Sequence, residues 1–404
     1  MGAPHARTTR NRRIALLAAA ALAFLFKTAL ALHTQGTLDA AASADYLARI
    51  EQYGGIGVYR IGGAFNNPFN NPPFTIHFLK ALGWLTGATG LPFAFWLRFP
   101  SILADAFSLY LVWKLLERSS RLRTDAPALL IVLALSPVSV IISGFHGNTD
   151  PLMIFFVLLS VYLLETRVGD VSVAAVAFGL ALSFKVAPLI FAPALWFYLP
   201  GMRQRIAYFG LAALVFLCGS LPYFLSDPVL VARSVFGYSS IYGHWGWTYL
   251  AATWFPDSLQ FARPPHGLLG AHAVAASVGK WSMLVLIAAA AFRFNRREQK
   301  PPLALQLGLA TAIFLFLTPG FGAQYLSWLV PWAIFLGLRA GLLYYVLGGL
   351  YLSVSYSCYI YRGAPPFYCV ELLTPALALA CWASVLILLL RYVRLLRSPD
   401  PEGA

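Results

Sequence analysis

The sequence predicts an all-α protein that crosses a membrane about twelve times. Of its 404 residues, 59% are hydrophobic and only 11% are charged, whereas a soluble domain carries about 25% charged residues. The mean hydropathy is +0.71. The apolar residues gather in runs that approach the length of a membrane-spanning helix, separated by short polar segments. We therefore predict a polytopic helical membrane protein with a single integral-membrane domain over residues 1–404.

The apolar runs place the expected helices. Several of them are shorter than the roughly 20 residues that a spanning helix needs, so we expect tilted, re-entrant or half-spanning segments among them. The runs fall at about 14–33, 95–116, 127–144, 152–164, 171–184, 186–200, 206–224, 267–291, 302–318, 327–338, 340–358 and 372–390.

The first run is expected to stay in the mature protein. Four arginines between residues 7 and 13 precede an apolar stretch from Ile14 to about Leu32. A signal peptide would end in a small-x-small cleavage site, but none is clear here, and the stretch carries Lys27. We interpret it as a first span with its N-terminus in the cytoplasm.

The basic residues support one orientation. Alternating spans place 19 of the 29 basic residues and 7 of the 15 acidic residues on the cytoplasmic side, a net charge of +12, against +2 on the other side. This is the asymmetry that the positive-inside rule predicts. The overall charge of +14 therefore does not indicate nucleic acid. We predict a multi-pass protein of the cell membrane with both termini cytoplasmic.

Two predicted outer loops, 34–92 and 225–265, are too long to be simple connections. Loops of this length are usually functional or disordered, and their aromatic content argues against disorder. Within the first loop, Ala40 to Tyr53 fits an amphipathic interfacial helix. The pair Pro72-Pro73 is expected to start a second short helix, from Phe74 to about Trp84, and no internal repeat typical of transporters is apparent.

A polar junction separates the apolar runs 127–144 and 152–164. It reads Phe-His-Gly-Asn-Thr-Asp-Pro over residues 145–151. Ionisable groups at membrane depth mark a functional site by default. We predict that His146, Asn148 and Asp150 line a wet, outward-facing cavity.

Several charged residues outside the junction have two possible roles. Asp45, followed by Tyr46, is either a general base for an acceptor hydroxyl or a solvated acid at a helix start. Arg98 and Asp105 share one helix face, so they form a structural ion pair or contact substrate. Lys185 either snorkels to the interface or binds a lipid phosphate.

Two further outer segments combine aromatic and polar residues. Arg233 and the Tyr238–Trp247 segment, which contains His244, suit an interfacial belt or the recognition of sugar and phosphate. Gln324 and Tyr325 follow a Pro-Gly turn at Pro319 that breaks two apolar runs, and Gln324 there needs a polar partner.

The sequence offers no metal site or nucleotide-phosphate loop. The four cysteines and seven histidines lack metal-binding spacing. Cys358 and Cys369 either pair across one loop or stay as free thiols. A donor carried in the lipid phase fits this layout better than a soluble nucleotide sugar, since the polar candidates gather on the outer side.

Taken in order, several of these segments resemble the GT-C superfamily of polytopic glycosyltransferases, which use polyprenyl-phosphate-linked sugars. The similarity is to the dolichyl-phosphate-glucose glucosyltransferases and related mannosyltransferases, and to bacterial polyprenyl-phosphate mannosyl- or hexosyltransferases. The segments that carry it are Arg98 to Asp105, His146 to Asp150, Ser183 to Lys185 with Ala192-Pro193, Arg233 to Trp245, and Pro319 to Tyr325.

The resemblance implies roles for individual residues. The glucosyltransferases carry an acid just before the paired prolines of the first outer loop, where this chain has Asn70 and Asn71. The Asp45-Tyr46 pair looks like an Asp-Tyr of related mannosyltransferases, so Asp45 is the expected base, with Asp150 in reserve and Asp39 also open. The expected phosphate ligands are Lys185 and Arg233, with Arg98.

The predicted function is inverting transfer of a hexose, mannose being favoured, from a polyprenyl-phosphate donor to a lipid-linked or envelope glycan acceptor on the extracytoplasmic face. The expected partners are the donor, a glycan or glycolipid acceptor and membrane lipid, with no nucleic acid. No cofactor is expected, because cationic side chains can neutralise the phosphate; a divalent metal stays open. The alternatives are a lipid-linked sugar flippase or transporter and, less favoured, a structural or assembly subunit.

Overall fold

The computed structural model describes residues 3–63, 68–166, 170–237, 240–255, 270–360 and 373–398. Over these residues the regular structure is helical, apart from one isolated antiparallel bridge between Ile241 and Phe321. The first half of the chain forms α1 (Ala3–His33), α2 (Leu38–Ile61), α3 (Phe74–Thr89), α4 (Phe93–Leu116), α5 (Ala126–Ala134), α6 (Pro137–Ile141), η2 (Ile142–His146), α7 (Asp150–Thr166), α8 (Val171–Phe184), η3 (Ala187–Phe191), α9 (Ala192–Tyr198) and α10 (Met202–Cys218). The second half forms α11 (Leu221–Ser226), α12 (Pro228–Phe236), α13 (Gly246–Trp254), α14 (Gly270–Asn295), α15 (Leu303–Leu317), η5 (Ala323–Tyr325), α16 (Leu326–Ala333), η6 (Ile334–Leu336), α17 (Leu338–Ile360) and α18 (Leu373–Arg397).

Six of the described helical segments are long and apolar enough to cross a membrane, and four more are apolar but shorter. The six are Ile14–His33, Phe93–Leu116, Ala126–His146, Gly270–Asn295, Leu338–Ser357 and Leu373–Arg397. The shorter ones are Val171–Phe184, Ala187–Tyr198, Leu303–Leu317 and Ala323–Leu336. The fold class is the predicted polytopic helical one, and the number of twelve crossings stays a prediction.

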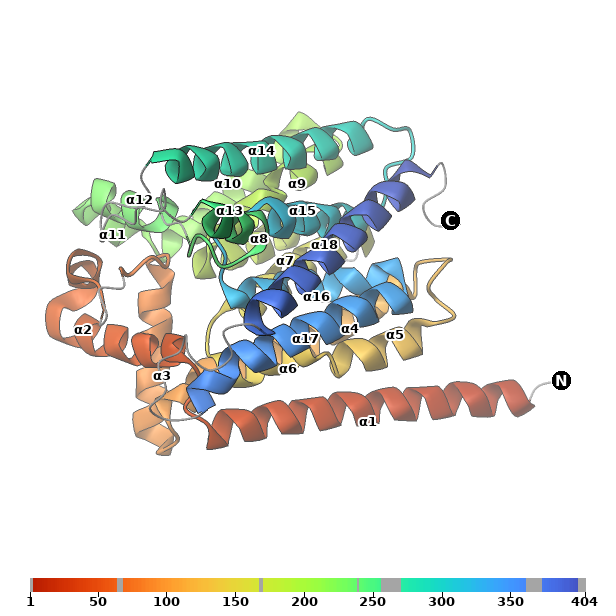
Figure 1. The fold of residues 1–404 in the computed structure, drawn as a ribbon, viewed down its shortest axis with the longest axis horizontal. Helices are drawn as coiled ribbons and strands as arrows, with labels where there is room; N and C mark the ends of the chain where they lie inside the picture. The colour runs from red at the N-terminus through yellow and green to blue at the C-terminus, as the bar shows by residue number, and fades with distance from the viewer. Residues whose placement is uncertain are drawn as a thin grey trace.

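The long helices form an elongated bundle with two different ends. In Figure 1, α2, α3, α11 and α12 gather at one end, while the N- and C-termini lie at the opposite end. The axis of α3 runs across the direction of the bundle helices rather than along it. The first predicted outer loop, 34–92, thus contributes the helices that cover one end of the bundle.

The two helices predicted in that loop are present. The first part of α2 ends at a kink at Gly54, next to the predicted end at Tyr53, and α3 is longer than expected. The hydroxyl of Thr37 caps α2 by accepting from the backbone N–H of Asp39. Ala42, Tyr46 and Ile50 are buried at intervals of four residues, which gives α2 its apolar face. The second helix, α3, begins directly after Pro73, as expected.

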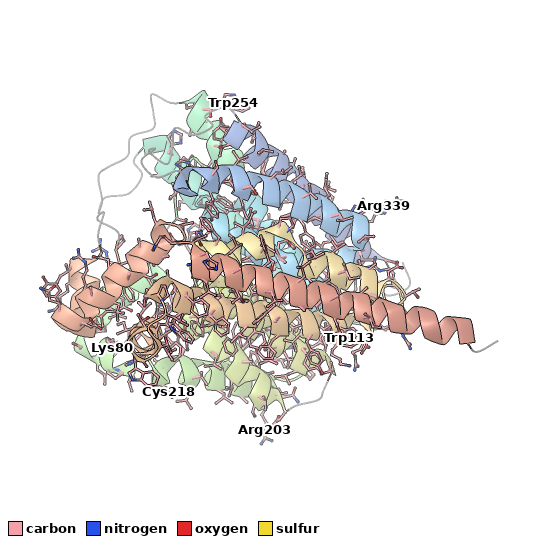
Figure 2. The ribbon with its side chains drawn as sticks, turned by 90° about the horizontal axis from the view of Figure 1, so that it is seen from below. Lys80, Trp113, Arg203, Cys218, Trp254 and Arg339 are labelled. Atoms are coloured by element: carbon pink, nitrogen blue, oxygen red, sulfur yellow. The ribbon has the colours of Figure 1, made fainter. Side chains whose placement is uncertain are left out.

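The flanks of the bundle are apolar. Leu17, Leu22 and Leu25 on α1 are 61–67% exposed, and Val278 and Trp281 on α14 are similarly exposed. Side chains of this kind at the surface of a helix bundle suit contact with lipid. Figure 2 shows Lys80 at the end formed by α2 and α3, with Trp113 and Arg339 toward the other end.

Candidate active site

The polar junction folds as a wide helical turn followed by a glycine corner. Residues Ile142–His146 form the π-helix η2, and Gly147 then adopts φ 88°. A β-carbon at Gly147 would lie 2.9 Å from Cβ of Ala40, at the start of α2. Glycine therefore permits both the left-handed backbone and the close approach of α2. The chain re-enters the bundle as α7 at Asp150.

His146 lies at the centre of a chain of hydrogen bonds at this corner. Its Nε2 is 3.0 Å from Oδ2 of Asp39, and its Nδ1 is 2.7 Å from the hydroxyl of Tyr356. The rings of His146 and Tyr356 stack with centroids 5.3 Å apart. The hydroxyl of Thr37 donates to the backbone oxygen of His146 at 2.8 Å. Two helices distant in sequence, α2 and α17, thus hold the imidazole in one orientation.

Asp39 is the accessible member of this group. Its side chain is 46% exposed, whereas that of His146 is 5% exposed. Burial of the carboxyl raises its pKa, but its interaction with His146 and the nearby charge of Lys185 hold the pKa below its ordinary value. Asp39 is therefore an ionised carboxylate that a substrate can reach at the outer-loop end of the bundle.

Asp150 forms a second polar group beside the first. It is fully buried, and its Oδ2 lies 2.5 Å from Nζ of Lys185, at the end of α8. Its Oδ1 accepts a hydrogen bond from the indole of Trp328 at 2.6 Å, and Trp328 packs against the ring of Tyr325 with centroids 4.5 Å apart. The side chain of Asn148 accepts from the backbone N–H of Asp150 at 3.1 Å and so starts α7.

Arg98 holds the backbone around the junction. The residue is fully buried, and its guanidinium donates to the oxygens of Ala31 and Thr34 at the end of α1, at 2.9 and 2.6 Å. It also reaches the oxygens of Gly144 and Phe145 in η2, at 3.4 and 3.3 Å. These contacts join the chain segment that leads to Asp39 to the segment that leads to His146.

The expected pairing of Arg98 with Asp105 does not occur. Asp105 instead lies 2.9 Å from Nζ of Lys27 on α1, and both contact the hydroxyl of Ser139, at 2.7 and 2.8 Å. The physical reason is direction: Arg98 reaches toward helix-end carbonyls with unpaired oxygens, while Asp105 faces α1. Asp105 thus forms a structural ion pair, as the sequence allowed, but its partner is Lys27 rather than Arg98.

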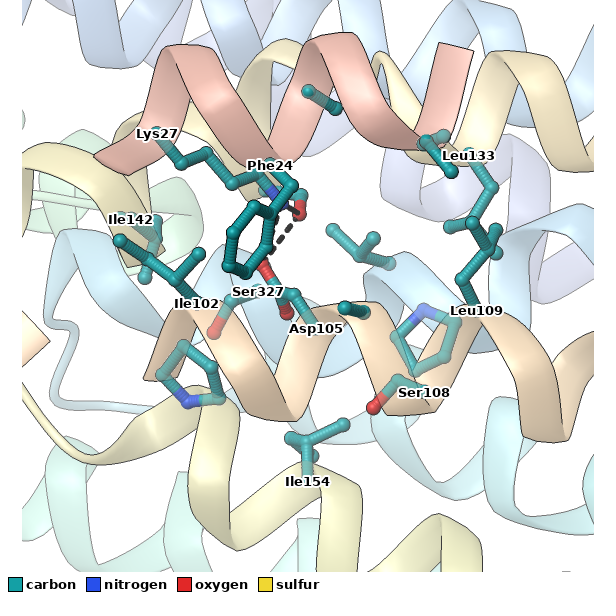
Figure 3. A pocket seen from close by; sticks show the side chains of 18 residues that line it. Phe24, Lys27, Ile102, Asp105, Ser108, Leu109, Leu133, Ile142, Ile154 and Ser327 are labelled. Atoms are coloured by element: carbon teal, nitrogen blue, oxygen red, sulfur yellow. Dashed lines mark hydrogen bonds and ion pairs between the residues drawn. The ribbon is translucent and has the colours of Figure 1, made fainter. Parts of the chain in front are cut away.

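The Lys27–Asp105 pair borders a cavity of about 80 Å³ between α1, α4 and the helices behind them. Figure 3 shows the two charged side chains meeting across the space, with Phe24, Ile102 and Leu109 among the apolar walls. The lining also includes Ile142, Pro151 and Ser327, which lie in or next to the elements that carry His146, Asp150 and Trp328. The cavity therefore lies beside the junction, inside the bundle.

The remaining predicted residues lie apart from these two groups. Asp45 forms an i,i+4 ion pair with Arg49 at 2.8 Å, with both side chains 28% exposed. It is six residues from Asp39, roughly 240° around α2, and so faces another side of the helix. Arg233 is exposed on α12.

The structure also describes the exposure of His244 and Gln324, and it bears in part on the cysteines and on metal binding. His244 is exposed, beside the buried Trp245, and Gln324 is half-buried in η5. The side chain of Cys358 and all of Cys369 lie outside the described residues, so their pairing stays open. Among the residues that the structure describes, no three His, Cys, Asp or Glu side chains group as metal ligands would. That no metal is needed stays a prediction.

Sequence reasoning missed two residues that complete the site and a third that borders the cavity beside it. Tyr356 and Trp328 lie within apolar helices, where an aromatic residue looks like core or lipid contact. Lys27 was noted only as a charge in the first span, and its place inside an apolar run was the signal that a partner existed.

The fold and the two polar groups describe a membrane protein with charged and hydrogen-bonding side chains gathered at one end of its helix bundle. Residues 142–257 match the model of a family described as mannosyltransferase (PIG-M). A search of curated proteins finds no match to the chain. The matched segment begins at η2 and contains His146, Asp150 and Lys185, and it supports the predicted GT-C glycosyltransferase class.

Proposed function

We propose that the protein transfers a hexose, mannose by preference, from a polyprenyl-phosphate donor to a lipid-linked or envelope glycan on the extracytoplasmic side of the cell membrane. The transferase class has the support of the family match over residues 142–257. The observation that carries the proposal is that an accessible carboxylate, Asp39, lies 3.0 Å from His146 in the same polar junction that holds Asp150 and its partner Lys185. A base and a cation so arranged suit attack on one side of a sugar and departure of phosphate on the other.

Asp39 is the base in this proposal. It accepts the proton of the acceptor hydroxyl while that oxygen attacks the anomeric carbon, and the bond from this carbon to the phosphate oxygen breaks. One displacement inverts the anomeric centre. The geometry favours Asp39 over Asp45, because Asp45 is paired with Arg49 and faces another side of α2. It also favours Asp39 over Asp150, whose two oxygens are buried and engaged by Lys185 and Trp328.

Lys185 binds the phosphate that leaves. Its ammonium can offer further N–H donors beyond the one held by Asp150, and its side chain is 20% exposed. Asp150 sets the position of the ammonium. Tyr325, packed on Trp328, offers an aromatic surface next to the same group, and Arg233, on the neighbouring outer helix α12, is a second candidate for the phosphate.

The test compares matched carboxylates of one helix. Purified protein, Asp39→Asn and Asp45→Asn are incubated with polyprenyl-phosphate-mannose or polyprenyl-phosphate-glucose and a membrane glycolipid extract, and mass spectrometry identifies the products. We expect Asp39→Asn to lose about 10²- to 10⁴-fold in rate and Asp45→Asn to retain activity within a few-fold.

Two outcomes overturn parts of the proposal. If Asp45→Asn is inactive while Asp39→Asn transfers sugar normally, the base assignment is wrong. If the wild-type protein makes no covalent product but carries lipid-linked sugar across sealed vesicles, the protein is a flippase rather than a transferase.

A further inference from the structure

We propose that Tyr356 is a positioning residue whose hydroxyl holds His146 in the neutral tautomer that donates from Nε2 to Asp39. The inference rests on the proposed function, in which Asp39 is the general base. It assigns a role to a residue of α17, which lies outside the segment matched to the mannosyltransferase family.

The geometry of the three residues is that of a relay. Tyr356 is 6% exposed, and its hydroxyl is 2.7 Å from Nδ1 of His146, while the opposite ring nitrogen is 3.0 Å from Oδ2 of Asp39. The two rings are within 18° of parallel. Stacking and the hydrogen bond therefore act together, so that the phenol controls both the tilt of the imidazole and the state of its Nδ1.

The hydrogen-bond partners select one tautomer. An ionised carboxylate can only accept a hydrogen bond, so Nε2 of His146 must carry the proton that faces Asp39. In a neutral ring Nδ1 then accepts, and its donor must be a hydroxyl. Thr37, whose Oγ is 3.3 Å from Nδ1, gives its proton to the backbone oxygen of His146 instead. The hydroxyl of Tyr356 is the donor that remains.

The surrounding charges act on the ring in opposite directions. Asp39 favours an imidazolium and Arg98 opposes it, while Lys185 and Asp150 offset each other as one ion pair. The titratable and charged groups on the elements packed around His146 include Asp39 on α2, Tyr356 on α17, Arg98 on α4, Lys185 with Asp150 at the ends of α8 and α7, and Lys27 on α1 with Asp105 on α4.

Loss of the phenol hydroxyl should therefore make His146 easier to protonate. In Tyr356→Phe the neutral ring loses the donor to Nδ1, whereas an imidazolium can still donate from Nδ1 toward Oγ of Thr37. A protonated His146 binds the proton-accepting carboxylate of Asp39 more strongly and weakens it as a base. Because the active form is the unprotonated one, the acid limb of the rate profile moves to higher pH, by about one pH unit.

The measurement is the pH dependence of kcat for sugar transfer by the full-length protein in lipid. The matched control is Tyr345→Phe, a buried tyrosine of the same helix whose hydroxyl donates to the backbone oxygen of Val330 at 2.7 Å. We expect Tyr356→Phe to shift the acid limb and Tyr345→Phe to leave it in place. An unshifted limb in Tyr356→Phe, or an equal shift in both variants, overturns the inference.

A second readout does not depend on activity. Nitrogen NMR of protein labelled with ¹⁵N-histidine distinguishes Nε2–H from Nδ1–H tautomers, and His146→Gln identifies the signal. Wild-type protein should show Nε2–H at His146 near neutral pH, and Tyr356→Phe should show this ring taking a second proton at higher pH than wild type. If the protein proves not to be a transferase, this NMR result still supports or rejects the role of Tyr356, so the two failures can be told apart.

Discussion

Nζ of Lys185 lies 2.5 Å from Oδ2 of Asp150, and the carboxylate is fully buried while the ammonium is partly exposed. Each member of such a pair stabilises the other, because removing one partner of a buried ion pair leaves an uncompensated charge. The indole of Trp328 satisfies the other carboxylate oxygen. The pair therefore fixes the end of α8 against the start of α7 and orients the cation assigned to the donor phosphate.

The first prediction concerns this pair. Lys185→Met should destabilise the fold by about 3–5 kcal/mol, because Asp150 would be left charged and buried. The double variant Lys185→Met/Asp150→Asn should recover most of that loss without recovering sugar transfer. Thermal unfolding in detergent measures the stability of each variant. Strictly additive effects of the two substitutions would show that the residues are not coupled.

A second prediction separates positioning from phosphate binding at Arg98. Arg98→Lys keeps the charge but loses the planar fork that reaches carbonyls of both α1 and η2. We expect kcat to fall roughly 10- to 100-fold, since displacement by about 1 Å costs that much, with little change in KM for the donor. A large rise in that KM at unchanged kcat would instead indicate direct contact with the lipid phosphate. Arg49→Lys, in the exposed pair on α2, is the control and should stay within about 0.5 kcal/mol of wild-type stability.

The third prediction tests the Lys27–Asp105 pair beside the cavity. Lys27→Met should cost about 3 kcal/mol of stability, because Asp105 would lose its cation and keep the hydrogen bond from Ser139. Replacing the pair together, with Lys27→Met/Asp105→Leu, should restore stability to near the wild-type value and leave sugar transfer within a few-fold. A double variant that is stable but inactive would show that these groups contact substrate, the other role that the sequence allowed for Asp105.

The fourth prediction concerns the glycine corner. Gly147→Ala should destabilise the protein by about 1–2 kcal/mol from the left-handed backbone alone, with a further loss from the clash with Ala40. Activity should fall with it, because Asp39 lies next to Ala40. The control is Gly87→Ala on α3, where no atom lies within 4 Å of the added β-carbon; it should be neutral or stabilising by up to about 1 kcal/mol. Equal effects of the two substitutions would contradict this account.

Local patterns in the sequence predicted much of the fold. The amphipathic stretch from Ala40 to Tyr53 and the proline pair before Phe74 became α2 and α3, because apolar periodicity and helix-start residues act within a few residues. The run 171–184 coincides with α8. The contacts between helices were less predictable, since they depend on how each helix is rotated in the bundle. Arg98 and Asp105 share a face by spacing, yet their partners come from η2 and α1.

The site was predictable in part. The polar junction was apparent from its own residues, because acids and histidines at membrane depth are rare. Asp39 was one acid among several on the predicted outer side. Only its contact with His146, more than a hundred residues away, distinguishes it from the others. Tyr356 gave no signal, since a tyrosine in an apolar helix is common at membrane interfaces.

The π-helix η2 places one more residue in its turn than an α-helix would. Each residue turns an α-helix by about 100°. A chain shortened by one residue between Ile142 and Phe145 would keep enough apolar length to cross the bilayer, yet it would turn His146 away from Asp39 and Tyr356. The length of this short stretch therefore decides whether the helix only has the length to span the membrane or also places His146 in contact with Asp39 and Tyr356.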